Sequence, residues 1–210
     1  AYSYLTTLSL EHHFRVLRHS PGLEEFALRR LFHDALARWE TADFIIADMP
    51  PTALAVRFFA SPTLSLTWIR HLLDLRREIR ARREMITRIR IGKTEVETDR
   101  VLRTLESEKQ RNDFLRQLFA DPSRCAVQLV INPDPLSWKE GTRIRHALQP
   151  LGIPLHRCVL NKAVGDDIEI PGELSDVPMT SVPCMAQSPT GLEDLRLLVH
   201  RLDTEAFLRW

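Results

Sequence analysis

The sequence has few cysteines and no long apolar run. Its three cysteines, Cys125, Cys158 and Cys184, form no C-x-x-C pair, which argues against a disulfide framework and against a zinc site built from this chain alone. No stretch approaches the roughly 18 apolar residues that a membrane-spanning helix needs. The first residues, Ala1 to Tyr4, lack the plan of a signal peptide. We therefore expect a soluble protein in a reducing compartment, the cytoplasm.

A charge excess of one sign is also absent. The chain has 29 lysines and arginines against 28 aspartates and glutamates, a formal net charge of +1. This balance gives no electrostatic reason to expect a polyanionic partner. We expect no nucleic-acid partner.

A complete phosphate-binding loop is missing from this sequence. Gly92-Lys93-Thr94 supplies the end of the pattern G-x-x-x-x-G-K-[ST], but Thr87 stands where the first glycine is required. The flanking residues have a helical pattern, whereas this loop joins a strand to a helix. We predict that the segment is not a phosphate-binding loop, so that this chain alone does not hold a triphosphate in the usual way.

The apolar patterns that are present predict an α/β fold with a doubly wound, mostly parallel sheet. A short apolar run without alternation is typical of a strand buried on both faces, and one occurs at 44–47. Further strands are expected at 126–131 and 157–160, each followed by turn or polar residues. A last short strand is expected at 180–185. Helical periodicity occurs at 23–39, 137–151 and 191–208, while the acidic segment 165–177 is expected to form a loop or mobile excursion. Alternation of strands and helices is typical of this fold class.

An inserted helical hairpin is predicted in the middle of the chain. One long helix is expected from Pro62 to about Arg90 and a second from about Glu95 to Phe119, with a turn at 91–93. We therefore expect three parts, which are residues 1–61 with the first strand, the helical subdomain 62–121, and the rest of the α/β domain at 122–210.

This hairpin is rich in arginine, which invites a nucleic-acid or acidic-membrane interpretation. Glutamates interrupt the arginines, and acidic residues on the second helix can pair with them. A solvated, salt-bridged hairpin is the simpler interpretation. The arginines are Arg76, Arg77, Arg80, Arg82, Arg83, Arg88 and Arg90.

Asp48 directly follows the first expected strand. A carboxylate at such a strand end can hold magnesium or its water close to a γ-phosphate. The alternative is that Asp48 is a turn or helix-cap residue. The position alone leaves both open.

Residues 42–58 resemble the switch II region of ArsA-like (arsenite-pump, anion-transporting) ATPases, in which a strand precedes D-T-A-P-T-G-H-T-L-R-L. The aspartate, second proline, threonine and arginine of that pattern fall on Asp48, Pro51, Thr52 and Arg57. The resemblance extends from about residue 21 to 202 and implies a P-loop NTPase-like fold. Its later motifs are Pro133-Asp134-Pro135, Gly152-Ile153-Pro154, Asn161-Lys162 and Val182-Pro183.

The resemblance implies an ATPase that uses ATP and Mg²⁺. Asp48 and Thr52 would then be catalytic, with Asp48 also at the metal, while Asn161 would hydrogen-bond the adenine and Pro183 would pack against the base. An amide offers the purine edge both a donor and an acceptor. The alternative is that Asn161 caps a strand end and Pro183 shapes a turn.

The resemblance also implies a homodimer that closes its sites across a symmetric interface. In the family, helices inserted at this place handle cargo, either a metalloid or the hydrophobic segment of a membrane-protein client. The resemblance therefore implies a membrane-protein or transporter partner among the alternatives. Its cysteines supply no recognisable metalloid site, so arsenite binding is not expected. The apolar residues from Leu64 to Ile79 could serve cargo, but core packing is the simpler expectation.

Two departures weaken the link between family and activity. Ala53 and Leu54 replace the family's glycine and histidine, which removes a residue that tolerates positive φ and an imidazole. We expect this chain alone to be inactive. Three interpretations stay open, which are an ATPase whose phosphate loop lies outside this sequence, a nucleotide-independent scaffold or interaction protein derived from that fold, and a helical adaptor whose expected strands do not exist.

Overall fold

The computed structural model describes residues 22–50, 52–91, 99–165, 168–200 and 202, with no side-chain description for 83–91. The chain forms two compact units, Ala1–Gln117 and Leu118–Trp210. Each is described by itself below. The segment Gly92-Lys93-Thr94, Pro51 and the end of the expected last helix lie outside the described residues.

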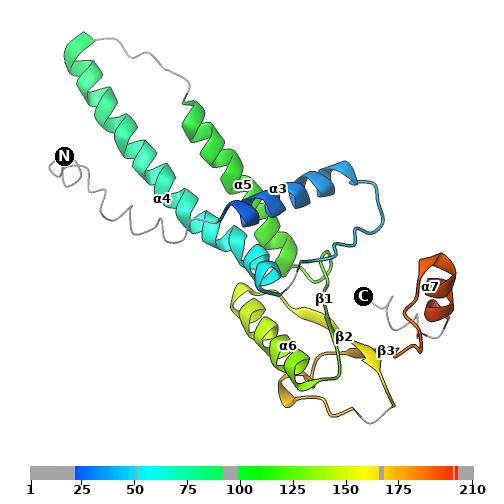
Figure 1. The fold of residues 1–210 in the computed structure, drawn as a ribbon. Helices are drawn as coiled ribbons and strands as arrows, with labels where there is room; N and C mark the ends of the chain where they lie inside the picture. The colour runs from blue at the N-terminus through cyan, green and yellow to red at the C-terminus, as the bar shows by residue number, and fades with distance from the viewer. Residues whose placement is uncertain (1–21, 51, 92–98, 166–167, 201, 203–210) are drawn as a thin grey trace. The chain divides into compact units, whose positions relative to one another are not determined.

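The described part of the first unit is helical. Its elements are α3 (Leu23–Arg38), α4 (Thr52–Ile91) and α5 (Arg100–Ala120), of which α5 runs into the second unit. Figure 1 shows α4 and α5 as the two long helices of the expected hairpin, with α3 against them. The predicted helix at 23–39 and the two long helices are confirmed, while most of the expected turn at 91–93 and the start of the second helix at Glu95 lie outside the described residues.

Helix α4 begins at Thr52, earlier than predicted, so that Pro62 lies inside the helix rather than at its start. A proline inside a helix cannot donate to the carbonyl oxygen four residues before it, here that of Phe58. The hydroxyl of Ser61 donates to this oxygen at 2.7 Å instead. A neighbouring side chain therefore replaces the missing backbone bond, and the helix continues through the proline.

Apolar residues of α4 form much of the first unit's core. Leu66, Ile69 and Leu73 recur at three or four residues and are buried, as are Phe58 on the same helix and Leu115 on α5. This spacing places them on one face of the helix. Core packing was the simpler of the two expectations for this stretch, and it is confirmed for these residues.

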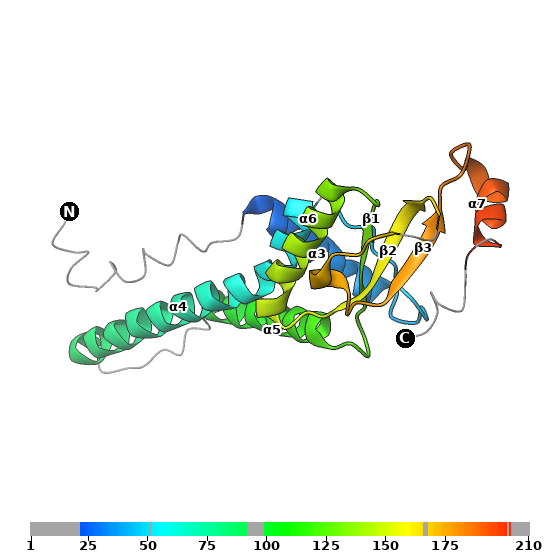
Figure 2. The ribbon, with the colours of Figure 1, turned by 90° about the horizontal axis from the view of Figure 1, so that it is seen from below.

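The second unit contains a parallel sheet in the order β1–β2–β3. Its strands are β1 (Val127–Ile131), β2 (Leu155–Ala163) and β3 (Met179–Pro183). Helix α6 (Pro135–Leu148) and a short 3₁₀ turn (Gln149–Leu151) connect β1 to β2, and Figure 2 shows α6 beside the strands. The α/β class with a parallel sheet is confirmed.

One face of the sheet packs against α6 in a continuous apolar cluster. The cluster consists of Leu129, Ile131, Trp138, Cys158, Leu160, Leu174 and Val177. Two of these, Leu174 and Val177, come from the segment 165–177 that was expected to be a loop or mobile excursion. Leu174 is fully buried in a 3₁₀ turn (Gly172–Leu174), and Arg145 on α6 binds Asp176 through two bonds of 2.5 and 2.7 Å. The described part of this segment is therefore anchored.

The strand predicted at 44–47 is wrong. Residues 44–50 have no regular secondary structure, and Phe44 and Ile46 are 63% and 94% exposed. A strand is stable only when neighbouring strands take up its backbone hydrogen bonds. The described part of the first unit offers helices only, so this apolar run has no ladder to join within its own unit.

The last predicted helix exists but is described over a shorter range, α7 (Gly191–Val199). Its residue Leu192 is 73% exposed. In the described part of the chain, no helix is both long enough and apolar enough to cross a membrane.

Candidate functional site

The carboxyl edge of the sheet brings two predicted site residues together. The three strands are parallel, so their carboxyl ends meet at one edge, which is where ligands bind in open α/β sheets. Asn161 on β2 pairs in register with Val182 on β3, and Pro183 is the next residue. The predicted neighbours Asn161 and Pro183 therefore lie on adjacent strands.

An irregularity in β2 shapes this edge. The register between β2 and β3 shifts between Asn161 and Ala163, and Lys162 between them has a φ of 58°. The left-handed conformation is uncommon for a lysine. Beyond the shift, the backbone N–H of Cys184 donates to the carbonyl oxygen of Ala163 at 2.9 Å. Bulges of this kind re-aim side chains at strand ends. Sequence reasoning missed it, because a lysine carries no signal for positive φ.

The amide of Asn161 is available to a ligand. Asn161 is half-buried, and its side chain has no hydrogen-bond partner within the described residues. An amide offers a carbonyl acceptor and two N–H donors, which matches the mixed donor and acceptor edge of a purine. Pro183, which follows the register partner of Asn161 on β3, carries an apolar ring. This donor set fits an adenine base.

The carboxylate that follows β1 has a structural role. Asp134 begins α6 and accepts hydrogen bonds from the backbone N–H groups of Leu136 at 3.0 Å and Ser137 at 2.9 Å. The hydroxyl of Ser137 also donates to it at 2.7 Å. These bonds, the side-chain one first, hold the pKa of Asp134 below its ordinary value. Asp134 is thus the cap of α6 rather than a free ligand.

Asp48 and Thr52 lie in the first unit, where the structure gives them unlike settings. Asp48 is exposed in the irregular segment before α4, and Thr52 is the first residue of α4 and half-buried. Neither follows a strand, because the strand at 44–47 does not form. Arg57, which matches the arginine of the switch pattern, pairs with Glu25 at 3.1 Å and Glu24 at 3.6 Å. This arginine ties α4 to α3.

Asp48 is the one magnesium ligand that the sequence predicts, so this chain would supply a single carboxylate to the ion. Over the residues described, no three histidines, cysteines, aspartates or glutamates come close enough to hold a metal. Magnesium is commonly held by one or two carboxylates together with waters and phosphates, so one aspartate fits such a role only beside a nucleotide.

The three cysteines are free, and they differ in exposure. Cys158 is fully buried, Cys125 is half-buried and Cys184 is exposed. Burial raises the pKa of both Cys125 and Cys158. These two side chains are therefore poor thiolate ligands. Cys158 is part of the apolar cluster between the sheet and α6.

Comparison with known proteins places this sequence in a family. The model of the anion-transporting ATPase family matches residues 3–171. The chain belongs to this family. A putative arsenical pump-driving ATPase 1 from Aquifex aeolicus (strain VF5) is 23% identical over 202 residues, which cover 85% of this chain and 50% of that protein.

Two further relatives are plant or algal ATPases. The ATPase GET3C of Arabidopsis thaliana is 24% identical over 145 residues, covering 68% of this chain and 37% of the relative. The ATPase ARSA1 of Chlamydomonas reinhardtii is 25% identical over 184 residues, covering 85% of this chain and 23% of the relative. The chain thus spans half or less of the length of the curated relatives that it matches.

Proposed function

We propose that this member of the anion-transporting ATPase family supplies the adenine-side half of an ATP site. Asn161 would bind the edge of the base and Pro183 would pack against its face. The amide of Asn161 supports this role, because it has no partner among the described residues and lies at the carboxyl edge of a parallel sheet. Its register partner on β3 is the residue before Pro183. The names of the relatives describe ATPases, which agrees with this assignment.

The phosphate side of the site belongs to a wider proposal. Asp48 would hold Mg²⁺ through its exposed carboxylate, and Thr52 would act beside it at the start of α4. The phosphate-binding groups would come from residues outside this sequence. ATP binding and hydrolysis would then drive the handling of cargo or of a partner by the hairpin of α4 and α5, in a homodimer.

A nucleotide-independent scaffold is the second candidate, and one observation favours it. Ala53 and Leu54 lie in the first turn of α4. Arg57 on the same helix ties α4 to α3. Alanine and leucine are strong helix formers, so this segment has little tendency to rearrange as a switch. A scaffold would keep the fold without binding nucleotide.

Titration of a protein that contains this chain together with the residues proposed to bind the phosphates separates the two candidates, with Mg-ATP as the ligand. We expect saturable binding that Asn161→Ala weakens by about tenfold, because the amide's hydrogen bonds to the base would be lost. GTP should compete poorly, since its base presents a different edge. Gln128→Ala is the matched control, because it removes an exposed amide from β1 in the same sheet, away from the carboxyl edge.

Two outcomes would contradict the ATP proposal. The first is the absence of saturable binding by isothermal calorimetry, which would favour the scaffold. The second is equal weakening by Asn161→Ala and Gln128→Ala, which would mean that the base is not bound at Asn161. Circular dichroism of each variant checks that the fold is intact.

A further inference from the structure

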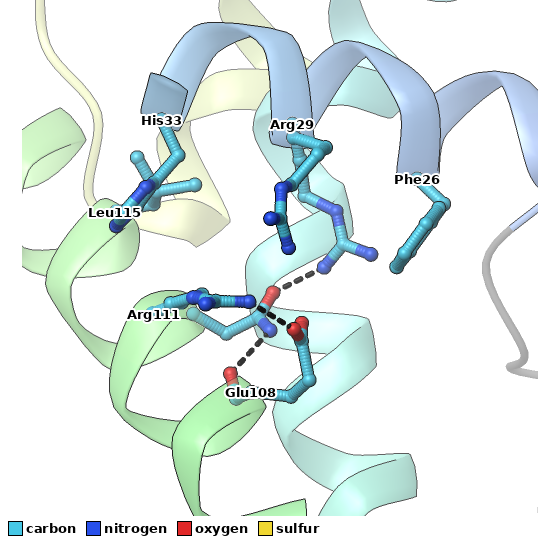
Figure 3. A pocket seen from close by; sticks show the side chains of 8 residues that line it. Phe26, Arg29, His33, Glu108, Arg111 and Leu115 are labelled. Carbon is cyan, nitrogen blue, oxygen red and sulfur yellow. Dashed lines mark hydrogen bonds and ion pairs between the residues drawn. The ribbon is translucent and has the colours of Figure 1, made fainter. Parts of the chain in front are cut away.

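A basic groove lies between α3 and α5, within the first unit. Residues on the facing sides of the two helices line a small pocket that is open to solvent. Figure 3 shows Arg29 and Arg111 extending from the two helices toward the same space, with Glu108 beside them. The lining residues are Phe26, Arg29, Arg30, His33, Glu108, Arg111, Asn112 and Leu115.

Arg29 is a buried cation at the base of this groove. It is 6% exposed, its hydrogen-bond partners within the described residues are all neutral oxygens, and its guanidinium carbon lies 6.0 Å from the centre of the Phe26 ring. Its Nη1 donates to Ser65 at 2.5 Å and to Asn112, and its Nε donates to the carbonyl oxygen of Glu25 at 3.4 Å. A buried charge normally requires a counter-charge.

The surroundings of Arg29 supply only part of that counter-charge. Burial lowers the pKa of Arg29, while the nearby carboxylates of Glu108 and Glu25 raise it by smaller amounts. Both carboxylates are engaged elsewhere, since Glu108 pairs with Arg111 at 2.6 Å and Glu25 pairs with Arg57. The Nη2 group of Arg29 has no partner among the described residues.

The remaining charges around the groove are also mostly positive. Three of its lining residues are arginines, and Glu108 is the one carboxylate among the lining residues that the structure describes. Arg30 at the mouth pairs with Asp34 through Nε at 3.3 Å, which leaves its other nitrogens open to solvent. Guanidinium groups are planar forks that bind oxyanions through paired N–H donors.

We propose that the groove between α3 and α5 is a surface binding site for a small oxyanion such as inorganic phosphate. Arg29 binds the anion from below through Nη2, and Arg111 and Arg30 bind it from the sides. The bound anion supplies the missing counter-charge of Arg29. The lining residues of the groove include neither Asn161 nor Asp48, so the proposal does not depend on the residues assigned to the nucleotide.

Titration of the full chain with inorganic phosphate tests the site, at an ionic strength kept constant with chloride. Arginine side-chain NMR signals should shift with a single saturating curve, and sulfate should compete. Arg111→Gln should weaken binding about tenfold, because one charged hydrogen-bonding partner is lost. Glu108→Gln should instead tighten binding, since the groove loses its lining carboxylate.

Arg103→Gln is the matched control, because it removes the same charge from an exposed position on α5 that does not line the groove. It should leave phosphate binding unchanged, as should Asn161→Ala. The proposal is overturned by a lack of saturation, by equal weakening in Arg103→Gln and Arg111→Gln, or by weaker binding in Glu108→Gln. Arg29 itself is left unchanged, because its loss would disturb the bonds to Ser65 and Asn112. Circular dichroism verifies the fold of each variant.

Discussion

Replacement of Ser61 by alanine should destabilise α4, because this serine compensates for the proline that follows it. Pro62 lacks the backbone N–H that would bind the carbonyl oxygen of Phe58. The hydroxyl of Ser61 binds that oxygen at 2.7 Å, and Phe58, Ser61 and Pro62 are all almost completely buried. Without the hydroxyl, the oxygen loses its hydrogen bond inside the core of the first unit.

The size of the effect follows from the burial of this oxygen. Loss of one hydrogen bond to a buried acceptor costs about 0.5–1.5 kcal/mol of unfolding free energy. In a Pro62→Ala background the new alanine supplies a backbone N–H, so Ser61→Ala should cost close to nothing. The two substitutions should therefore be coupled by about 0.5–1.5 kcal/mol.

Urea unfolding followed by circular dichroism measures this coupling in the original chain, the two single variants and the double variant. Thr67→Ala is the matched control, because its hydroxyl donates to the carbonyl oxygen of Thr63 at 3.2 Å in an exposed, proline-free turn of the same helix. The control should change stability by no more than about 0.5 kcal/mol. The reasoning is refuted if Ser61→Ala costs the same whether residue 62 is proline or alanine.

Two further predictions concern the second unit. Asp134→Ala should lower the urea midpoint at pH 7, and the difference from the original chain should shrink in acid. Because the pKa of Asp134 is lowered in the folded protein, the stability that this carboxylate contributes is complete above the ordinary carboxyl pKa. It is lost as the pH falls through the lowered pKa. An unchanged difference in urea midpoint at pH 3 would contradict the capping role. Leu174→Ala should lower the free energy of unfolding by about 2–5 kcal/mol in the same assay, because the side chain is fully buried. The control Leu192→Ala, at a 73% exposed position, should lower it by less than about 0.5 kcal/mol. Similar losses in both variants would show that the 3₁₀ turn is not part of the core.

Local patterns predicted most elements of this chain. The apolar spacing of residues 23–39 and the apolar residues at 126–131 led to α3 and β1, because both patterns are produced by neighbours along the chain. The parallel arrangement also followed, and the structure adds that Asn161 and Pro183 lie on adjacent strands. Their roles at a nucleotide stay predictions.

The same kind of pattern failed at 44–47, where an apolar run suited to a buried strand is exposed. Whether such a run becomes a strand depends on partners elsewhere in the fold, and the described part of its unit contains only helices. Pro62 was likewise expected to begin a helix, because the rule for proline considers the backbone and not the hydroxyl of a neighbouring serine.

The sequence by itself determined the family, the α/β class and the order of most helices and strands, since periodicity and ordered motifs are properties of the chain alone. Only the tertiary structure decided that Lys162 turns the end of β2, that Leu174 is buried under the sheet, and that Arg29 and Arg111 face one groove. These features depend on contacts between residues far apart in the chain. No local pattern contains them, because packing selects which faces of the helices and strands meet.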